Sequence, residues 1–232
     1  MNQINAENPE LPEYTIKRTS GPIKIDGKLD EADWSAAKSV GEFKFAWYES
    51  GKKEQTEAKM LWDDKYLYVS YLCEDAHISA TRTERGSSVW LDDCVEVFTA
   101  PNADDNQNYF NIEMNVNQAF LEGHHPKGHG TSAKERWRCE GIQIATTVKG
   151  TLNDDSDEDS YWILEAAIPF SAFAHVAKHT PPQPGDMWFK PQSSGWGNHQ
   201  QYSQWSPGTT IEPQYHAPQD FGRVYYSADV VK

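Results

Sequence analysis

The chain has 232 residues, a formal net charge of −14 and 38% hydrophobic residues. This length suits one large β-sandwich or two small domains. The acidic balance excludes nucleic acid as an expected partner, because binding there relies on Lys and Arg neutralising phosphates. No apolar stretch approaches the ~20 residues that cross a bilayer, so no membrane span is expected.

The beginning of the chain predicts a lead-in, an edge strand and a short helical turn. Residues 1–13 are polar, lack a signal-peptide pattern and are expected to be disordered, and residues 14–232 are expected to form a single domain. Tyr14–Ile25 then predicts an edge strand. Asp30 is a candidate N-cap for a helical turn over Glu31–Ala37.

Short runs of aromatic and β-branched residues, separated by turn residues, predict about ten strands in all. The clearest are Thr56–Trp62, Tyr66–Cys73, Val89–Thr99, Phe110–Val116, Ile142–Lys149, Tyr161–Pro169, Met187–Pro191 and Gly222–Ala228. Many short strands with little helix predict an all-β fold, an antiparallel β-sandwich with one or two short helices, the second at Ser171–Val176, and long rim loops.

One predicted strand has two different faces. In Phe110–Val116 the apolar residues alternate with Asn111, Glu113 and Asn115, so one face should meet the core and the other should be wet or functional. Two long loops, Gly123–Gly130 and Gly195–Pro218, carry Trp, Gly, His and Pro and are longer than ordinary connections. Loops of that length are often functional.

Composition adds three further expectations. The 9 Trp, 11 Tyr and 9 Phe should mostly fill the core, with a few forming an exposed platform. Three widely separated cysteines without a CxxC spacing predict buried free thiols. The acidic stretch Asn153–Ser160 could bind calcium, but it lacks the spacing of an EF-hand, and a solvated hairpin loop is the better interpretation.

Five motifs in order carry a family resemblance. They are IDGKLDEADW at Ile25–Trp34, LWDDKYLYV at Leu61–Val69, WLDDCVEVF at Trp90–Phe98, WILEAAIP at Trp162–Pro169, and a closing element made of SQWSP at Ser203–Pro207 and HAPQDFG at His216–Gly222. Together they resemble a family 9-type carbohydrate-binding module, within the broader group of DOMON-like sandwiches. Most motif positions are expected to be structural, such as Gly27 in a turn, Trp34 and Leu67 in the core and Pro169 at a strand end.

The resemblance implies a sugar site between two aromatic rings. Sugars offer C–H faces that stack on rings and hydroxyls that need fixed polar partners. In the sugar-binding members of the family the first ring falls on Trp90 of this chain, the second on Tyr215 and the hydroxyl-accepting carboxylate on Glu96. Asn111 stands where those members carry an arginine, which is a departure from the pattern.

Two further residues are candidates for the same site. Lys190 could supply the cation that Asn111 does not, and Trp196 could add a third stacking surface. The implied partner is an oligo- or polysaccharide and the implied location is secreted or periplasmic. No cofactor is required, and a structural calcium ion is a further expectation from the family.

Other functions remain open at this stage. Acidic residues such as Asp92, Asp93, Glu96 and Glu113 could form a glycosidase pair, although no GxSxG or HExxH motif is present and a non-catalytic module is expected. Related sandwiches bind haem through Met with His or Lys, and others serve only for protein contacts. The segment His124–His129 holds three histidines and could bind a transition metal, but a surface loop is the ordinary interpretation.

Overall fold

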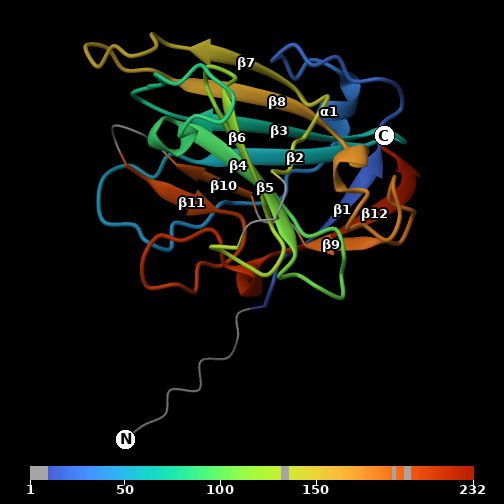
Figure 1. Cartoon of the computed structure of the whole chain (residues 1–232). Helices are drawn as coiled ribbons and strands as arrows, with labels where there is room; N and C mark the ends of the chain where they lie inside the picture. Colours follow the sequence, from blue (N-terminus) through green and yellow to red (C-terminus); the bar gives the residue numbers. More distant parts are fainter. Residues whose placement is uncertain (1–9, 132–135, 190–191, 196–199) are drawn as a thin grey trace, which may run out of the picture.

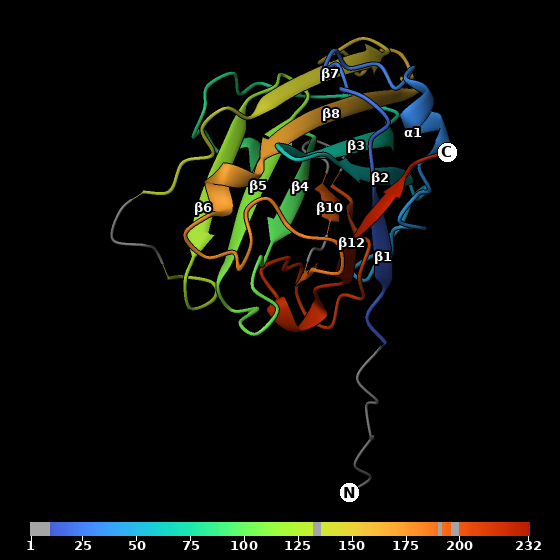
Figure 2. The ribbon, with the colours of Figure 1, turned by 90° about the vertical axis from the view of Figure 1, so that its right-hand side faces the viewer.

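The computed structural model describes residues 10–131, 136–189, 192–195 and 200–232, which form two stacked β-sheets (Figures 1 and 2). The larger sheet contains β1 (Glu13–Arg18), β2 (Thr56–Trp62), β3 (Tyr66–Glu74), β7 (Gln143–Lys149), β8 (Tyr161–Pro169), β9 (Met187–Phe189) and β12 (Arg223–Val230). The smaller sheet contains β4 (Cys94–Thr99), β5 (Tyr109–Asn115), β6 (Phe120–His125), β10 (Gln192–Gly195) and β11 (Tyr202–Gln204). The predicted β-sandwich is therefore confirmed.

The strand order explains where the sequence prediction falls short. The larger sheet runs β7-β8-β3-β2-β1-β12-β9 and the smaller β11-β10-β4-β5-β6. Described pairs are antiparallel except at β1, which pairs in parallel with both β2 and β12. β1 therefore lies inside the sheet, and its prediction as an edge strand was wrong, because both neighbours come from distant parts of the chain.

Other differences concern short elements. The predicted strand at Met187–Pro191 begins with β9, which ends at Phe189 and belongs to the larger sheet, whereas β10 belongs to the smaller one. β11 forms within the predicted loop Gly195–Pro218, and the end of β6 extends into the predicted loop Gly123–Gly130. The helical elements are α1 (Ala32–Ala36) and the 3₁₀ turns η1 (Val89–Leu91), η2 (Phe170–Phe173) and η3 (Pro218–Asp220). Glu31, not Asp30, occupies the N-cap position of α1 and makes no side-chain capping bond.

The core lies between the sheets and follows the alternation of side chains along the strands. The smaller sheet contributes Val95, Val97, Ile112 and Met114 to it, and the larger sheet contributes residues such as Met60, Val69, Leu164 and Ile168. The same alternation turns Glu96, Asn111 and Glu113 to the other face of the smaller sheet. That face carries the candidate site described below.

The first and fourth motifs meet at one buried carboxylate. Glu165 on β8 is fully buried and accepts hydrogen bonds from Trp34 Nε1 at 2.8 Å and from the backbone N–H groups of Asp26 at 3.1 Å and Gly27 at 3.2 Å. Gly27 has φ +77°, and a Cβ there would lie 2.7 Å from the carbonyl oxygen of Thr146. These motif residues therefore stabilise the sandwich, and none of them lines the pocket described below.

The closing motif is structural in the same way. Trp205 is buried and donates from Nε1 to the Val40 carbonyl at 2.7 Å. A Cβ at Gly222 would lie 2.6 Å from the Trp205 ring, so glycine is needed for this packing. Asp159 in the acidic loop accepts backbone bonds from Ile78 and Thr151, so part of that loop braces the chain.

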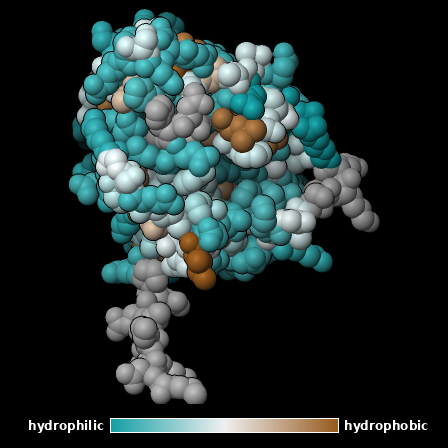
Figure 3. All heavy atoms as spheres, turned by 90° about the vertical axis from the view of Figure 1, so that its left-hand side faces the viewer, coloured by the Kyte–Doolittle hydropathy of each residue, from teal (hydrophilic) through white to brown (hydrophobic). Residues whose placement is uncertain are grey.

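The surface is mostly hydrophilic (Figure 3), as the low share of hydrophobic residues in the sequence leads one to expect. The face in Figure 3 is dominated by hydrophilic residues with small hydrophobic patches. Cys73, Cys94 and Cys139 are buried free thiols, as predicted. Among the described residues there is no helix with the length and hydropathy of a bilayer-spanning segment.

Candidate functional site

The floor of the site is the outer face of β4, β5 and β6. In the strand register Glu96 pairs with Glu113, and Glu113 pairs with Leu121. Because partners directly opposite in an antiparallel sheet lie on the same face, these three side chains form one row pointing away from the core. Asn111 precedes Glu113 by two residues on β5, so it lies on the same face, and it pairs with Gly123 of β6.

The side-chain amide of Asn111 connects the carboxyl groups of Glu96 and Glu113 by hydrogen bonds. Its Nδ2 donates to Glu96 Oε1 at 2.9 Å and to Glu113 Oε1 at 3.0 Å, and all three side chains are buried. Its Oδ1 lies 3.0 Å from His125 Nε2. The amide thus offsets part of the repulsion between two carboxylates that stand opposite each other.

Glu113 is chemically distinct from an ordinary surface glutamate. Burial raises the pKa of Glu113 to about 7, against the opposing effect of the Asn111 hydrogen bond. Its Oε2 is buried and has no hydrogen-bond partner among the described residues. Near neutral pH this group can therefore hold a proton and donate a hydrogen bond, or lose it and accept one.

A pocket of about 390 Å³ opens over this floor. Its lining residues come from η1, β4, β5, β6, β11 and the loop before η3, and they are Trp90, Cys94, Glu96, Glu113, Leu121, Tyr202, Pro213, Gln214, Tyr215 and His216. The volume lies at the lower end of the range for small-molecule sites, and the mixture of rings with a few polar groups is typical of them.

The two predicted stacking residues line this same pocket. Trp90 lies on η1 with 59% of its surface exposed, which is unusual for so large an apolar side chain. Tyr215 is half-buried and is held edge-on by Trp47, with ring centroids 5.7 Å apart, and by Tyr202 at 6.4 Å. Trp90 is therefore available to a ligand, and Tyr215 is fixed in orientation by its neighbours.

The remaining predicted residues are placed differently. Asn111 supports the two carboxyl groups and is not among the residues that line the pocket. Lys190 and Trp196 lie outside the described residues. The structure thus brings Trp90, Glu96 and Tyr215 to one pocket, with Asn111 hydrogen-bonded to Glu96.

Sequence reasoning did not assign six pocket residues to the site: Cys94, Leu121, Tyr202, Pro213, Gln214 and His216. It considered Glu113 only as part of a catalytic pair. The alternation in Phe110–Val116 already places Glu113 with Asn111 on the polar face. His216 lies in an irregular loop and so has no alternation signal, and the sequence marked it only as the first residue of the closing motif HAPQDFG.

His216 sits in an aromatic cluster at one end of the pocket. Its Nδ1 lies 3.0 Å from the hydroxyl of Tyr109, and its ring packs on Phe98 with centroids 5.1 Å apart. Burial lowers the pKa of His216 to about 3, with repulsion from His125 and His129 adding to the effect. The imidazole is therefore neutral at physiological pH.

Two groups of described side chains have the spacing of metal ligands: His125 with His129 and His216, and Glu96 with Glu113 and His216. In each group one candidate ligand atom per residue lies within 4.8 Å of the others. Met114, a methionine that a haem site could use, is fully buried between the sheets in the core.

Solved structures share this fold, and some of them contain a bound sugar. A provisionally assigned carbohydrate-binding protein from Bacteroides uniformis superposes with a TM-score of 0.79 at 18% identity, covering 94% of this chain and all of that one. A family 9 carbohydrate-binding module from Caldicellulosiruptor kristjanssonii superposes with TM-scores of 0.63 in its complex with cellotriose and 0.62 in its complex with glucose. Each complex is 16% identical to this chain. The cellotriose complex covers 93% of this chain and 94% of its own, and the glucose complex covers 92% of this chain and 96% of its own.

Curated relatives are large enzymes that the chain matches in part. Endo-1,4-beta-xylanase A of Thermotoga maritima is 27% identical over 120 residues, which is 49% of this chain and 11% of the enzyme. Exoglucanase XynX of Acetivibrio thermocellus is 26% identical over 152 residues, which is 66% of this chain and 12% of the enzyme. The chain therefore aligns with a small fraction of each relative.

A family model described as "Carbohydrate family 9 binding domain-like" matches residues 25–227, which is nearly the whole described fold. The match includes all five motifs and every described residue that lines the pocket. The chain therefore belongs to the carbohydrate family 9 binding domain-like family.

Proposed function

We propose that the pocket binds a gluco-oligosaccharide or a related polysaccharide without cleaving it. The observation that carries the proposal is the convergence of Trp90, Tyr215 and Glu96 on one pocket of about 390 Å³. An indole and a phenol offer flat surfaces for the C–H faces of a sugar ring. The volume suits a short segment of one or two sugar rings.

The polar floor suits hydroxyl groups. A sugar hydroxyl both donates and accepts, so a site that offers both functions pairs it completely. Glu96 is held by Asn111 as an acceptor, and Glu113 can donate when protonated because burial raises its pKa to about 7. His216, neutral beside them, adds a ring nitrogen at the same end of the pocket.

The placement of the carboxyl groups favours binding over catalysis. In most glycosidases two carboxyl groups flank the scissile bond ~5–9.5 Å apart. Glu96 and Glu113 instead stand side by side on one sheet face and share one amide donor. This arrangement supports a non-catalytic module.

Calorimetric titration with glucose, cellobiose, cellotriose and xylobiose tests the proposal. Trp90→Ala is expected to weaken binding of the best ligand by ~30-fold or more, equivalent to ~2 kcal/mol for the loss of an aromatic hot spot. Leu91→Ala is the matched control, since Leu91 is exposed in the same turn and does not line the pocket. Equal affinities in the two variants would reject the site.

We propose that residues 14–232 act as one accessory module of, or partner to, glycoside-active enzymes outside the cytoplasm. Its family membership and its partial alignment with a xylanase and an exoglucanase support this role. A structural calcium ion stays a prediction from the family, and loss of thermal stability in a chelator, restored by calcium, would test it.

A further inference from the structure

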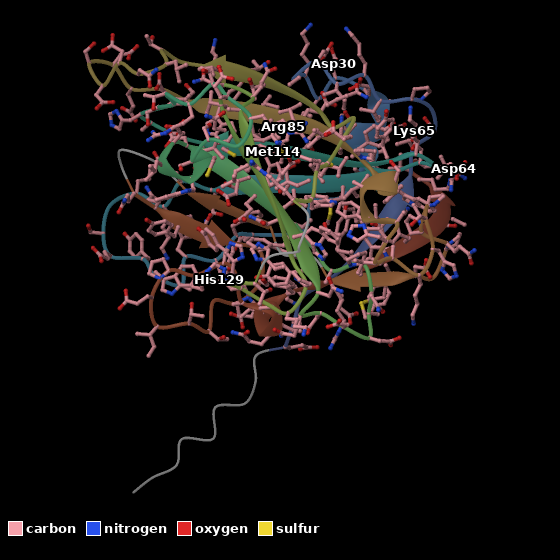
Figure 4. The ribbon with its side chains drawn as sticks, in the orientation of Figure 1. Asp30, Asp64, Lys65, Arg85, Met114 and His129 are labelled. Atoms are coloured by element: carbon pink, nitrogen blue, oxygen red, sulfur yellow. The ribbon has the colours of Figure 1, made fainter. Side chains whose placement is uncertain are left out.

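Two histidines from β6 and the loop after it lie close to His216, which lines the pocket. His125 ends β6, His129 follows in the next loop, and His216 lies almost ninety residues further on. The ring centroids of His129 and His216 are 4.3 Å apart and those of His125 and His216 are 4.8 Å apart. Figure 4 labels His129 within this region of the molecule, and one ring nitrogen of each histidine lies within 4.8 Å of the others.

The sequence cluster His124–His129 splits in the fold. His124 and His125 are consecutive on β6 and therefore point to opposite faces. His124 stacks on Phe110, with centroids 4.2 Å apart, and hydrogen-bonds to Asn108. In the fold, the ring that lies close to His125 and His129 is therefore that of His216 and not that of His124.

Asn111 determines which nitrogen of His125 is available. Its Nδ2 donates to two carboxyl groups, so its Oδ1 must face His125 Nε2 and can only accept from it. Neutral His125 therefore carries its proton on Nε2 and presents a lone pair on Nδ1. That Nδ1 is buried without a hydrogen-bond partner among the described residues.

Tyr109 contacts two of the three histidine rings, those of His216 and His125. Its buried hydroxyl lies 3.0 Å from His216 Nδ1, which leaves Nε2 of that ring for a ligand. Its own ring stacks on His125, with centroids 4.9 Å apart and planes 21° apart. Metal-binding histidines commonly use one ring nitrogen for an orienting hydrogen bond of this kind and the other for the ion.

We propose that His125, His129 and His216 bind one first-row divalent transition-metal ion, with Zn²⁺ as the representative occupant. Three imidazole nitrogens suit Zn²⁺, Ni²⁺ or Cu²⁺ and do not suit Ca²⁺, which takes oxygen ligands. Three protein ligands leave the fourth tetrahedral position open. Because His216 also lines the sugar pocket, the ion would lie beside that pocket.

Competition of tag-free full-length protein with a chromophoric Zn²⁺ chelator, and the visible spectrum with Co²⁺, test the site without any sugar. We expect one equivalent of tightly bound ion, and at least a tenfold loss of affinity in His129→Ala. His129 is exposed, so this variant should fold normally. The matched control is His179→Ala, an exposed histidine that pairs with Asp186 elsewhere.

Two further variants separate the alternatives. Tyr109→Phe keeps the stacked ring and removes the hydroxyl, and about a tenfold loss of affinity is expected for such an orienting partner. Glu113→Gln keeps an amide oxygen that can accept from Asn111, so it should weaken ion binding much less than His129→Ala does. Loss of binding in Glu113→Gln with retention in His129→Ala would move the ion to the carboxyl group and overturn the proposal, as would equal affinities in His129→Ala and His179→Ala.

Discussion

Glu96 and Glu113 stand directly opposite each other on β4 and β5, on the face of the smaller sheet that turns away from the core. Two carboxyl groups in this position repel when both are charged. Their shared amide donor and the elevated pKa of Glu113 relieve that repulsion. The site therefore holds polar groups whose cost to the fold should depend on pH.

Replacing Glu113 by Gln should remove that pH dependence. Burial raises the pKa of Glu113 from 4.5 to about 7, so the folded chain holds this proton more tightly than the unfolded chain. The folded state is then favoured below pH 4.5 and loses stability as the pH rises to about 7. Above pH 7 we expect the free energy of unfolding of Glu113→Gln to exceed that of the wild type by roughly 3 kcal/mol at most.

Urea denaturation between pH 4.5 and pH 8 measures this difference. Glu42→Gln is the control, because Glu42 is exposed and this substitution removes the same charge from the surface. Burial raises the pKa of Asp75 to about 6, and this group adds the same dependence of stability on pH to every variant. A stability difference between Glu113→Gln and wild type that does not change with pH would contradict the assignment.

Gly123→Ala should damage the site through Asn111. A Cβ at residue 123 would lie 2.5 Å from Asn111 Oδ1 and 3.0 Å from His125 Nε2, so the Asn111 amide must shift from the position in which it bonds both carboxyl groups. We expect a loss of about 2 kcal/mol in the free energy of unfolding, because buried polar groups lose partners, together with weaker sugar binding. Gly21→Ala, with no atom within 4 Å of its Cβ, should change neither quantity.

Tyr215 should contribute its ring more than its hydroxyl. Tyr215→Ala is expected to weaken sugar binding about tenfold, whereas Tyr215→Phe keeps the flat surface packed against Trp47 and Tyr202 and should retain most of the affinity. Calorimetric titration with the best ligand compares the two. A larger loss in the Phe variant than in the Ala variant is incompatible with stacking.

Glu165 should support stability without affecting the affinity of correctly folded protein. Glu165→Ala leaves the indole N–H of Trp34 and the backbone N–H groups of Asp26 and Gly27 without their acceptor. The expected loss is about 3 kcal/mol in the free energy of unfolding, measured by denaturant titration. Glu57→Ala on the exposed side of β2 is the control, and a similar small change in both variants would refute this role.

The sequence by itself determined the strands and the structural motifs. Alternation along Phe110–Val116 separated the core face from the polar face because successive side chains of any strand point in opposite directions. The glycine at residue 27 and the tryptophan at residue 34 were correctly assigned to a turn and to the core. These features depend on local chain geometry, which the sequence carries directly.

Only the tertiary structure decided how distant segments meet. β1 lies between two parallel partners, β2 and β12, and nothing in its own residues specifies either pairing. In the same way, His125 and His129 meet His216 and not His124, because the strand turns His124 to the opposite face and a remote loop brings His216 over the sheet. Contacts between distant segments depend on how the sheets pair and pack, and the pocket and the histidine cluster are made of such contacts.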